Sequence, residues 1–163
     1  MNRDTMNGER KRDDVTTELL SEMYRNVTMG SENLAAVVPR IRDRGLMENV
    51  TSQLEQYADF TNRTAEMLSK RGVTAKEPTI MKKAMSRGGI MVNAMIDPSA
   101  EHIAQMIEKG TETGADQLQL KFEQFRDRGC DAEALSLCGD ILAFERREIA
   151  LANDMRGGRD SRE

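Results

Sequence analysis

The sequence predicts an all-α fold, namely a four-helix bundle in which two antiparallel helical hairpins are joined by a long crossover that contains a short helix. Charged residues make up 32% of the 163 residues and there are only 3 prolines, a composition that favours helix over sheet. Apolar residues recur at three- and four-residue steps in four long stretches, as on the buried face of a helix. The first and last connections between these stretches are short and the middle one is long, which is the pattern of two hairpins and a crossover.

The first hairpin is predicted from two consecutive stretches. The first stretch opens after Asp13 and Asp14, either of which can cap a helix. Its apolar stripe is Val15, Leu19, Met23, Val27, Gly30, Leu34, Val37 or Val38, and Ile41. Pro39 has no amide proton to donate, so we expect the helix to kink or end near residues 36–38. Gly45 is expected to form a left-handed C-terminal cap before the second stretch. The stripe of that stretch is Met47, Val50, Leu54, Tyr57, Thr61 and Leu68.

The second hairpin follows the same logic. Asp97 and Pro98 are a suitable helix start, because proline at the first helical position loses no hydrogen bond. The third stripe is Ile103, Ile107, Gly110, Gly114, Leu118, Phe122 and Phe125. Gly129 is expected to end this helix and Asp131 to cap the fourth. The fourth stripe is Leu135, Cys138, Leu142, Glu145, Ile149 and Ala152.

These stretches define one domain, since the chain is long enough for a single core and short for two. We expect the bundle to span residues 14–156, with the crossover at 72–97. Residues 1–13 and 157–163 contain almost no apolar side chains and are predicted to be disordered tails. The N-terminal segment lacks the apolar run of a signal peptide, and no stretch is apolar for long enough to cross a bilayer. We therefore predict a cytoplasmic protein without stable membrane insertion.

Net charge and cysteine content narrow the function classes. The formal net charge is -4, which argues against a dedicated nucleic-acid-binding protein because such proteins need a surplus of Lys and Arg on one face. Cys130 is predicted at a turn and Cys138 about two helical turns later, too far apart for a disulfide. Both are expected to be free thiols in a reducing compartment, with Cys138 in the core.

Three segments with many small and polar residues lie on the predicted helices: YRNVTMGSENLAA at residues 24–36, QLEQYADFT at 53–61 and IEKGTETGAD at 107–116. Together they resemble a bacterial group of small ferritin-like proteins of uncharacterised function. The similarity covers roughly residues 14–155 and rests on helix lengths, the crossover and scattered small residues. It implies a ferritin-like bundle, and many ferritin-like proteins bind two iron or manganese ions through glutamates and two Glu-x-x-His motifs.

The sequence departs from that metal-binding pattern. Its single histidine is His102, and the residue three positions before it is Ser99, so not even one Glu-x-x-His motif is present. A site made only of carboxylates stays open as an alternative, since oxygen ligands suit hard divalent metals. Its ligands would be Glu32, Glu112, Glu145 and Glu148. We expect no bound metal and no cofactor.

Individual residues give further expectations. Glu145 occupies a stripe position where an apolar side chain would be expected, and a buried carboxylate is costly unless it is paired. We expect it either at the edge of the stripe or paired with a cation. The candidate partners are Arg25, Lys121 and Arg126. His102 is interpreted as a surface residue in the first turn of its helix, and Gly110 and Gly114 as positions that allow close helix packing.

Three function classes follow. The leading interpretation is a non-catalytic ferritin-like bundle that acts as a structural or protein-interaction module, as a homodimer or with another protein. The alternative is a divalent-metal protein, an oxidoreductase or a storage protein for iron or manganese with glutamate ligands. A catalytic thiol protein is the weakest, because no Cys–His set is recognisable around the single histidine. No catalytic or cofactor-binding residue is predicted.

Overall fold

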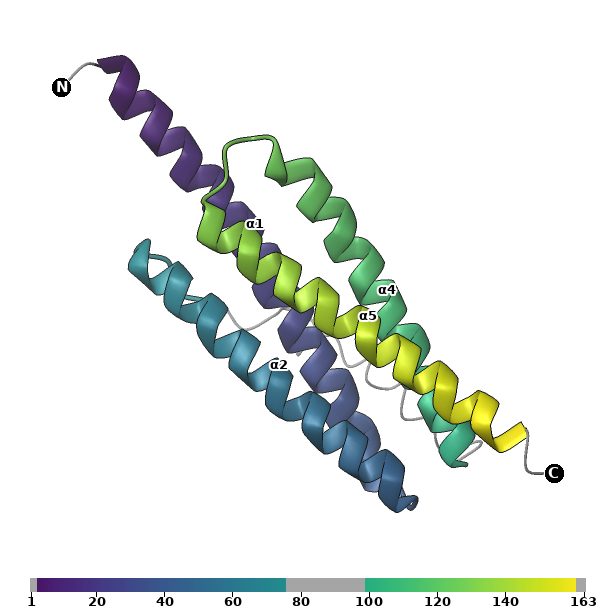
Figure 1. Ribbon diagram of the computed structural model, residues 1–163. Helices are drawn as coiled ribbons and strands as arrows, with labels where there is room; N and C mark the ends of the chain where they lie inside the picture. The colour runs from purple at the N-terminus through teal and green to yellow at the C-terminus, as the bar shows by residue number, and fades with distance from the viewer. Residues whose placement is uncertain (1–2, 76–98, 161–163) are drawn as a thin grey trace.

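The computed structural model describes residues 3–75 and 99–160, and over these it is an all-α four-helix bundle made of two helical hairpins (Figure 1). A short 3-10 turn, η1 (Val38–Arg40), follows the first helix. The helices are α1 (Arg3–Val37), α2 (Arg44–Lys70), α4 (Ala100–Arg126) and α5 (Ala132–Asp160).

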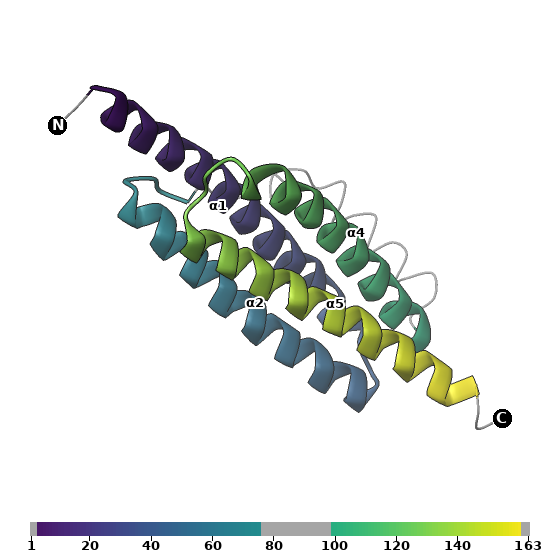
Figure 2. The same ribbon diagram turned by 45° about the horizontal axis from the view of Figure 1, so that its top comes forward.

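The two hairpins are connected across the length of the bundle. In Figures 1 and 2, α1 runs antiparallel to α2 and α4 runs antiparallel to α5. The end of α2 and the start of α4 lie at opposite ends of the bundle, so the connection between the hairpins has to traverse it. This confirms the predicted order of two hairpins and a crossover in place of a short-looped up-and-down bundle. The short helix predicted within 72–97 falls mainly outside the described residues.

The turn between α1 and α2 confirms the prediction made from Pro39 and contradicts the one made from Gly45. Pro39 lies in η1, directly after α1 ends at Val37, as predicted. Asp43 caps α2, its side chain accepting a hydrogen bond from the Leu46 amide at 2.8 Å. The predicted left-handed cap at Gly45 is wrong, because Gly45 lies in the first turn of α2 and does not have a positive φ. The aspartate two residues earlier is the helix start, and the 3-10 turn already reverses the chain.

The second hairpin begins at a different cap from the one expected. Ser99 caps α4 by accepting a hydrogen bond from the His102 amide at 3.2 Å, whereas Asp97 and Pro98 lie outside the described residues. Gly129 has a φ of +83° in the turn after α4, which confirms its predicted role. Asp131 accepts a hydrogen bond from the Glu133 amide at 3.2 Å and so caps α5, also as predicted.

The helices extend further than the sequence patterns suggested. α1 begins at Arg3 and therefore includes most of the segment 1–13 that was expected to be a tail. Its first turns project beyond the bundle in Figure 1, and the side chains of residues 6–14 are exposed. Strong helix formers at Glu9, Arg10 and Lys11 continue the helix without any core contact. α5 likewise continues to Asp160, into the predicted tail 157–163.

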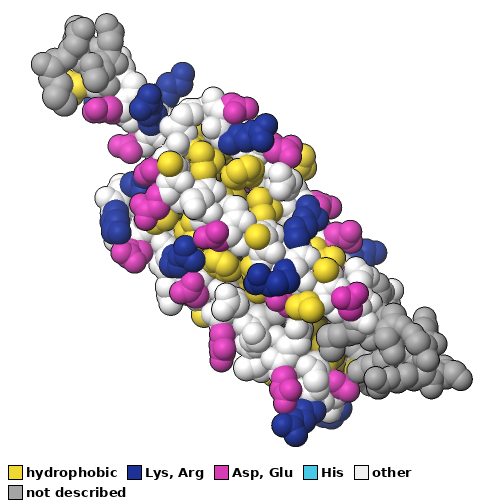
Figure 3. Space-filling view, viewed as in Figure 1, with side chains coloured by type: hydrophobic (Ala, Val, Ile, Leu, Met, Phe, Trp, Pro, Cys, Tyr) yellow, Lys and Arg dark blue, Asp and Glu magenta, His cyan; other side chains and the backbone are white. Residues whose placement is uncertain are grey.

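The core contains much of the predicted stripes but does not coincide with them. Predicted members such as Met47, Leu54 and Phe122 are only half-buried, whereas Leu20, Leu46 and Phe60 lie in the core outside the predicted stripes. On α1, Val15, Leu19 and Met23 are buried, and the same spacing continues through Val27, Leu34 and Val37. On the face seen in Figure 3, acidic and basic side chains alternate along the bundle with hydrophobic side chains between them. Among the described helices none is long and apolar enough to cross a membrane.

Candidate functional site

A cavity of about 60 Å³ lies between the helices and is bounded by residues of all four of them. Its polar lining consists of Asn26, Asn33, Tyr57, Thr111 and Glu145. Its apolar lining consists of Met29, Leu34, Val37, Met106 and Ile107. Gly110 also lines the cavity and is exposed, so the cavity reaches the surface beside α4.

Glu145 is the titratable group at the bottom of this cavity. It comes from the middle of α5 and is only 1% exposed. Its Oε1 accepts a hydrogen bond from the Tyr57 hydroxyl at 3.1 Å, whereas its Oε2 is buried without a hydrogen-bond partner. Burial raises the pKa of Glu145 to about 7, and the Tyr57 hydrogen bond, the nearby Asn26 amide and the charge of Arg146 offset part of that effect. The carboxyl group therefore changes its charge near neutral pH.

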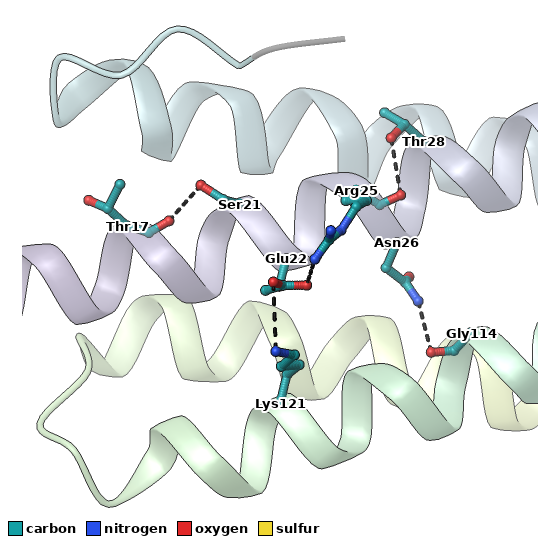
Figure 4. Close-up of polar contacts among 8 residues, drawn as sticks. All are labelled: Thr17, Ser21, Glu22, Arg25, Asn26, Thr28, Gly114 and Lys121. Atoms are coloured by element: carbon teal, nitrogen blue, oxygen red, sulfur yellow. Dashed lines mark hydrogen bonds and ion pairs between the residues drawn. The ribbon is translucent and has the colours of Figure 1, made fainter. Parts of the chain in front are cut away.

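The cationic partners predicted for Glu145 are engaged elsewhere, so that prediction is wrong. Figure 4 shows Arg25 and Lys121 both directed at Glu22, which forms an ion pair with each of them. Arg126 pairs with its neighbour Asp127, at 3.6 Å. The stripe position places Glu145 in the interior. The three long cationic side chains extend into water and do not reach Glu145, because a charge costs far less free energy in water than in the core.

Tyr57 is the partner that takes the place of a cation. Its ring packs edge-on against Phe144, with ring centroids 5.1 Å apart. Burial and the adjacent Glu145 raise its pKa well above 10, so the hydroxyl keeps its proton at neutral pH and acts as a donor to the carboxyl group. Gly30 makes room for this ring, because a Cβ at that position would lie 2.6 Å from Tyr57 Cζ.

Asn26 supplies a second unpaired acceptor. Its Nδ2 donates a hydrogen bond from α1 to the Gly114 carbonyl on α4 at 3.0 Å, as Figure 4 shows. That carbonyl can only accept, so the contact fixes which end of the amide faces α4. Asn26 Oδ1 is buried without a partner. A Cβ at Gly114 would lie 3.3 Å from Asn26 Nδ2, so a glycine there permits close helix approach, as predicted.

The four glutamates of the alternative metal site occupy different environments. Glu145 is buried, Glu32 and Glu148 are half-buried, and Glu112 is exposed. Asn49 donates a hydrogen bond to Glu148 at 3.4 Å. Within residues 3–75 and 99–160, no three histidine, cysteine, aspartate or glutamate side chains are grouped closely enough to hold a metal ion. The polar groups next to Glu145 are the phenol of Tyr57 and the amide of Asn26, and not further carboxylates.

The remaining candidates lie apart from the cavity. His102 is in the first turn of α4, as predicted, but it is half-buried with a buried Nε2 and is not the surface residue that was expected. Cys138 is fully buried in the core, and burial raises its pKa to about 12. Burial also raises the pKa of Cys130. Both thiols are free and stay protonated at neutral pH, which makes them poor nucleophiles.

Sequence reasoning singled out Glu145 and missed Asn26 and Thr111 as lining residues. Tyr57 and Gly30 were identified only as members of apolar stripes. A glycine on one helix can face the ring of a tyrosine on the neighbouring helix. The sequence does not say which residues of the two stripes face each other. Comparison of the chain with protein-family models, with curated proteins and with solved structures gives no match.

Proposed function

We propose that the protein is a non-catalytic binding module, a helical bundle that holds a small ligand in the cavity around Glu145. One observation carries this proposal. Two buried oxygen acceptors, Glu145 Oε2 and Asn26 Oδ1, lack hydrogen-bond partners among the described residues and belong to residues that line the same cavity. Buried polar atoms without partners are rare in folded proteins because each costs free energy. A ligand that donates hydrogen bonds to them would recover that cost.

The chemistry of the cavity favours binding over turnover. Tyr57 keeps its proton and Asn26 does not titrate, so Glu145 is the one lining group whose charge changes near neutral pH. Both free thiols stay protonated and are not among the lining residues. A single carboxyl group can move one proton, but the lining hydroxyls are not activated as nucleophiles, because Tyr57 keeps its proton and Thr111 donates to the Ile107 carbonyl.

The proposal is tested by binding to the isotopically labelled protein. Small fragments in three classes, cationic, neutral and anionic, are titrated while the backbone amide signals of Gly110, Thr111 and Gly114 are followed by NMR. We expect at least one class to shift these signals saturably and to be recovered chemically unchanged. If no fragment of any class binds there, or if a bound fragment is converted to product, the proposal is wrong.

Two glycine substitutions provide a matched pair of variants. Gly110 lines the cavity, and a Cβ built there meets no atom within 4 Å, so Gly110→Met should narrow the opening without straining the fold. Gly139 on α5 also has free space around its Cβ position and does not line this cavity. Binding should be lost in Gly110→Met and retained in Gly139→Met. Equal binding by both variants would place the ligand outside the cavity.

We also propose that the bundle is ferritin-like and works without a metal. The support is its order of two hairpins joined across the length of the bundle, together with the segments at 24–36, 53–61 and 107–116. A homodimer or another protein partner stays part of the proposal. Among the described side chains, the large hydrophobic ones exposed on the surface are Met6, Leu120 and Leu151.

A further inference from the structure

We propose that the cavity binds the protonated amino group of a small amphipathic primary amine, with the ammonium against Glu145 and Asn26 and the carbon chain against the apolar wall. This inference rests on the proposed binding function and names the chemical class of its ligand.

The polar groups next to Glu145 already donate hydrogen bonds inside the protein, and Asn33, the remaining polar lining residue, is half-buried. Tyr57 donates to Glu145, and Thr111 donates to the Ile107 carbonyl at 2.9 Å. Asn26 donates to the Gly114 carbonyl, and its amide also lowers the pKa of Glu145. Within the described part of the chain, the buried polar atoms of this lining that lack a hydrogen-bond partner are two acceptor oxygens, Glu145 Oε2 and Asn26 Oδ1. A complementary ligand must therefore bring donors, and a primary ammonium brings three.

The charge at this end of the cavity points to the same class. Glu145 receives a neutral hydrogen bond from α2 through Tyr57, a neutral amide from α1 through Asn26, and the close approach of Gly114 from α4. On its own helix, Arg146 acts on it through its charge but donates to Asp116 at 2.8 Å. A buried carboxylate without a directly bonded cation favours a ligand that supplies one, because an unpaired charge in a protein core costs free energy. When the ammonium binds, a protonated Glu145 releases its proton to solvent and forms an ion pair.

The rest of the wall selects a short apolar chain. Leu34, Val37 and Ile107 line the cavity beyond the polar end, and Met29 and Met106 are half-buried lining residues with flexible side chains. A volume of about 60 Å³ corresponds to roughly four water-sized groups. That is enough for an ammonium and a chain of a few carbons, with any longer part leaving past Gly110.

The test compares three probes of the same length: n-butylamine, n-butanol and n-butyrate. Each is titrated into the full chain at pH 8, and the affinity is measured from the amide shifts of Gly110 and Gly114. We expect the amine to bind with one-to-one stoichiometry and at least tenfold more tightly than the alcohol or the acid. Glu145→Gln, which keeps the shape and removes the charge, should lose that tenfold preference while the alcohol binds as before.

A second measurement separates charge recognition from a change in shape. Amine affinity should rise about tenfold from pH 6 to pH 8 in the natural chain, because the ionised fraction of Glu145 rises by that factor, and should stay level in Glu145→Gln. Equal binding of amine and alcohol, or an amine affinity independent of Glu145, would overturn the inference and leave the binding function standing. Binding by none of the probes or fragments would overturn both, and saturable binding of Mn²⁺ at Glu145 in place of the amine would also overturn the inference.

Discussion

Glu145 keeps its proton at a pH where exposed glutamates have lost theirs, because the bundle interior disfavours the charge. Its pKa is raised from 4.5 to about 7 in the folded chain, so the folded state binds this proton more tightly than the unfolded state does. The resulting contribution to stability is fully present below pH 4.5 and is lost as the pH rises through 7. A difference of this size corresponds to about 3 kcal/mol.

We expect Glu145→Gln to remove this pH dependence. The free energy of unfolding of the natural chain, minus that of the variant, should fall by about 3 kcal/mol between pH 4.5 and pH 8. The stability of the variant relative to the natural chain should therefore be higher at pH 8 than at pH 4.5. Urea denaturation at four pH values in this range measures the difference. A difference that stays constant with pH would mean that Glu145 has the same pKa in the folded and unfolded states.

Gly30 is the second residue at which a small change has a defined effect. The Cβ of Gly30→Ala would overlap the Tyr57 ring, which is itself held by Phe144 and by the hydrogen bond to Glu145. The gain in helix propensity, about 1 kcal/mol, is smaller than the usual cost of overpacking a core. We expect a net loss of about 1–2 kcal/mol in the free energy of unfolding.

The control for this substitution is Gly139→Ala, since its Cβ meets no atom within 4 Å. That variant should be as stable as the natural chain or slightly more stable, by up to about 1 kcal/mol. If both alanine variants are stabilised equally, the Tyr57 ring has room to move, and the close approach of α1 and α2 at Gly30 is not a constraint on the fold.

At the scale of elements, the first turns of α1 are helix without a core to support them. The side chains of residues 6–14 are exposed, and Val15 is the first buried one among the side chains that the structure describes. Removing residues 1–10 should therefore leave the melting temperature unchanged, with a loss of helical signal that matches the missing turns. Removing residues 1–20 also takes Leu19 and Leu20 from the core and should lower the melting temperature strongly. Circular dichroism on both truncated chains measures this, and an equal fall in both would assign a structural role to the projecting turns.

The sequence predicted elements better than it predicted the site, for a physical reason. Helix periodicity is local, so the α1 stripe from Val15 to Val37 could be identified directly and proved to be buried. Helix ends were less certain, because competing signals lie within a few residues of each other, as at Asp43 and Gly45. The site depends on tertiary pairing: Tyr57 and Glu145 are 88 positions apart, and so are Asn26 and Gly114. No local sequence pattern specifies which polar side chains of different helices will contact each other.

At the scale of the whole molecule, the two hairpins meet along two seams of different character. Between α1 and α4 the seam contains the Asn26–Gly114 hydrogen bond and the Glu22–Lys121 ion pair (Figure 4). Between α2 and α5 it contains the Tyr57–Glu145 hydrogen bond and the packing of Phe60 and Tyr57 on Phe144. Exposed ion pairs such as Arg63–Asp140 add little to either seam, so most of the docking energy comes from the shared apolar core.

A shared core predicts that the hairpins fold as one unit. Either hairpin alone would expose the inner faces of two helices, and helices of this length gain most of their stability from packing. Helix content by far-ultraviolet circular dichroism and tyrosine fluorescence should therefore change at the same urea concentration. The chain has no tryptophan and only two tyrosines, so a Tyr24→Phe variant makes the fluorescence report on Tyr57 and hence on the seam between α2 and α5. Separate midpoints would show that this seam opens before the helices unfold, and a stably helical fragment of residues 99–160 would likewise contradict a single cooperative core.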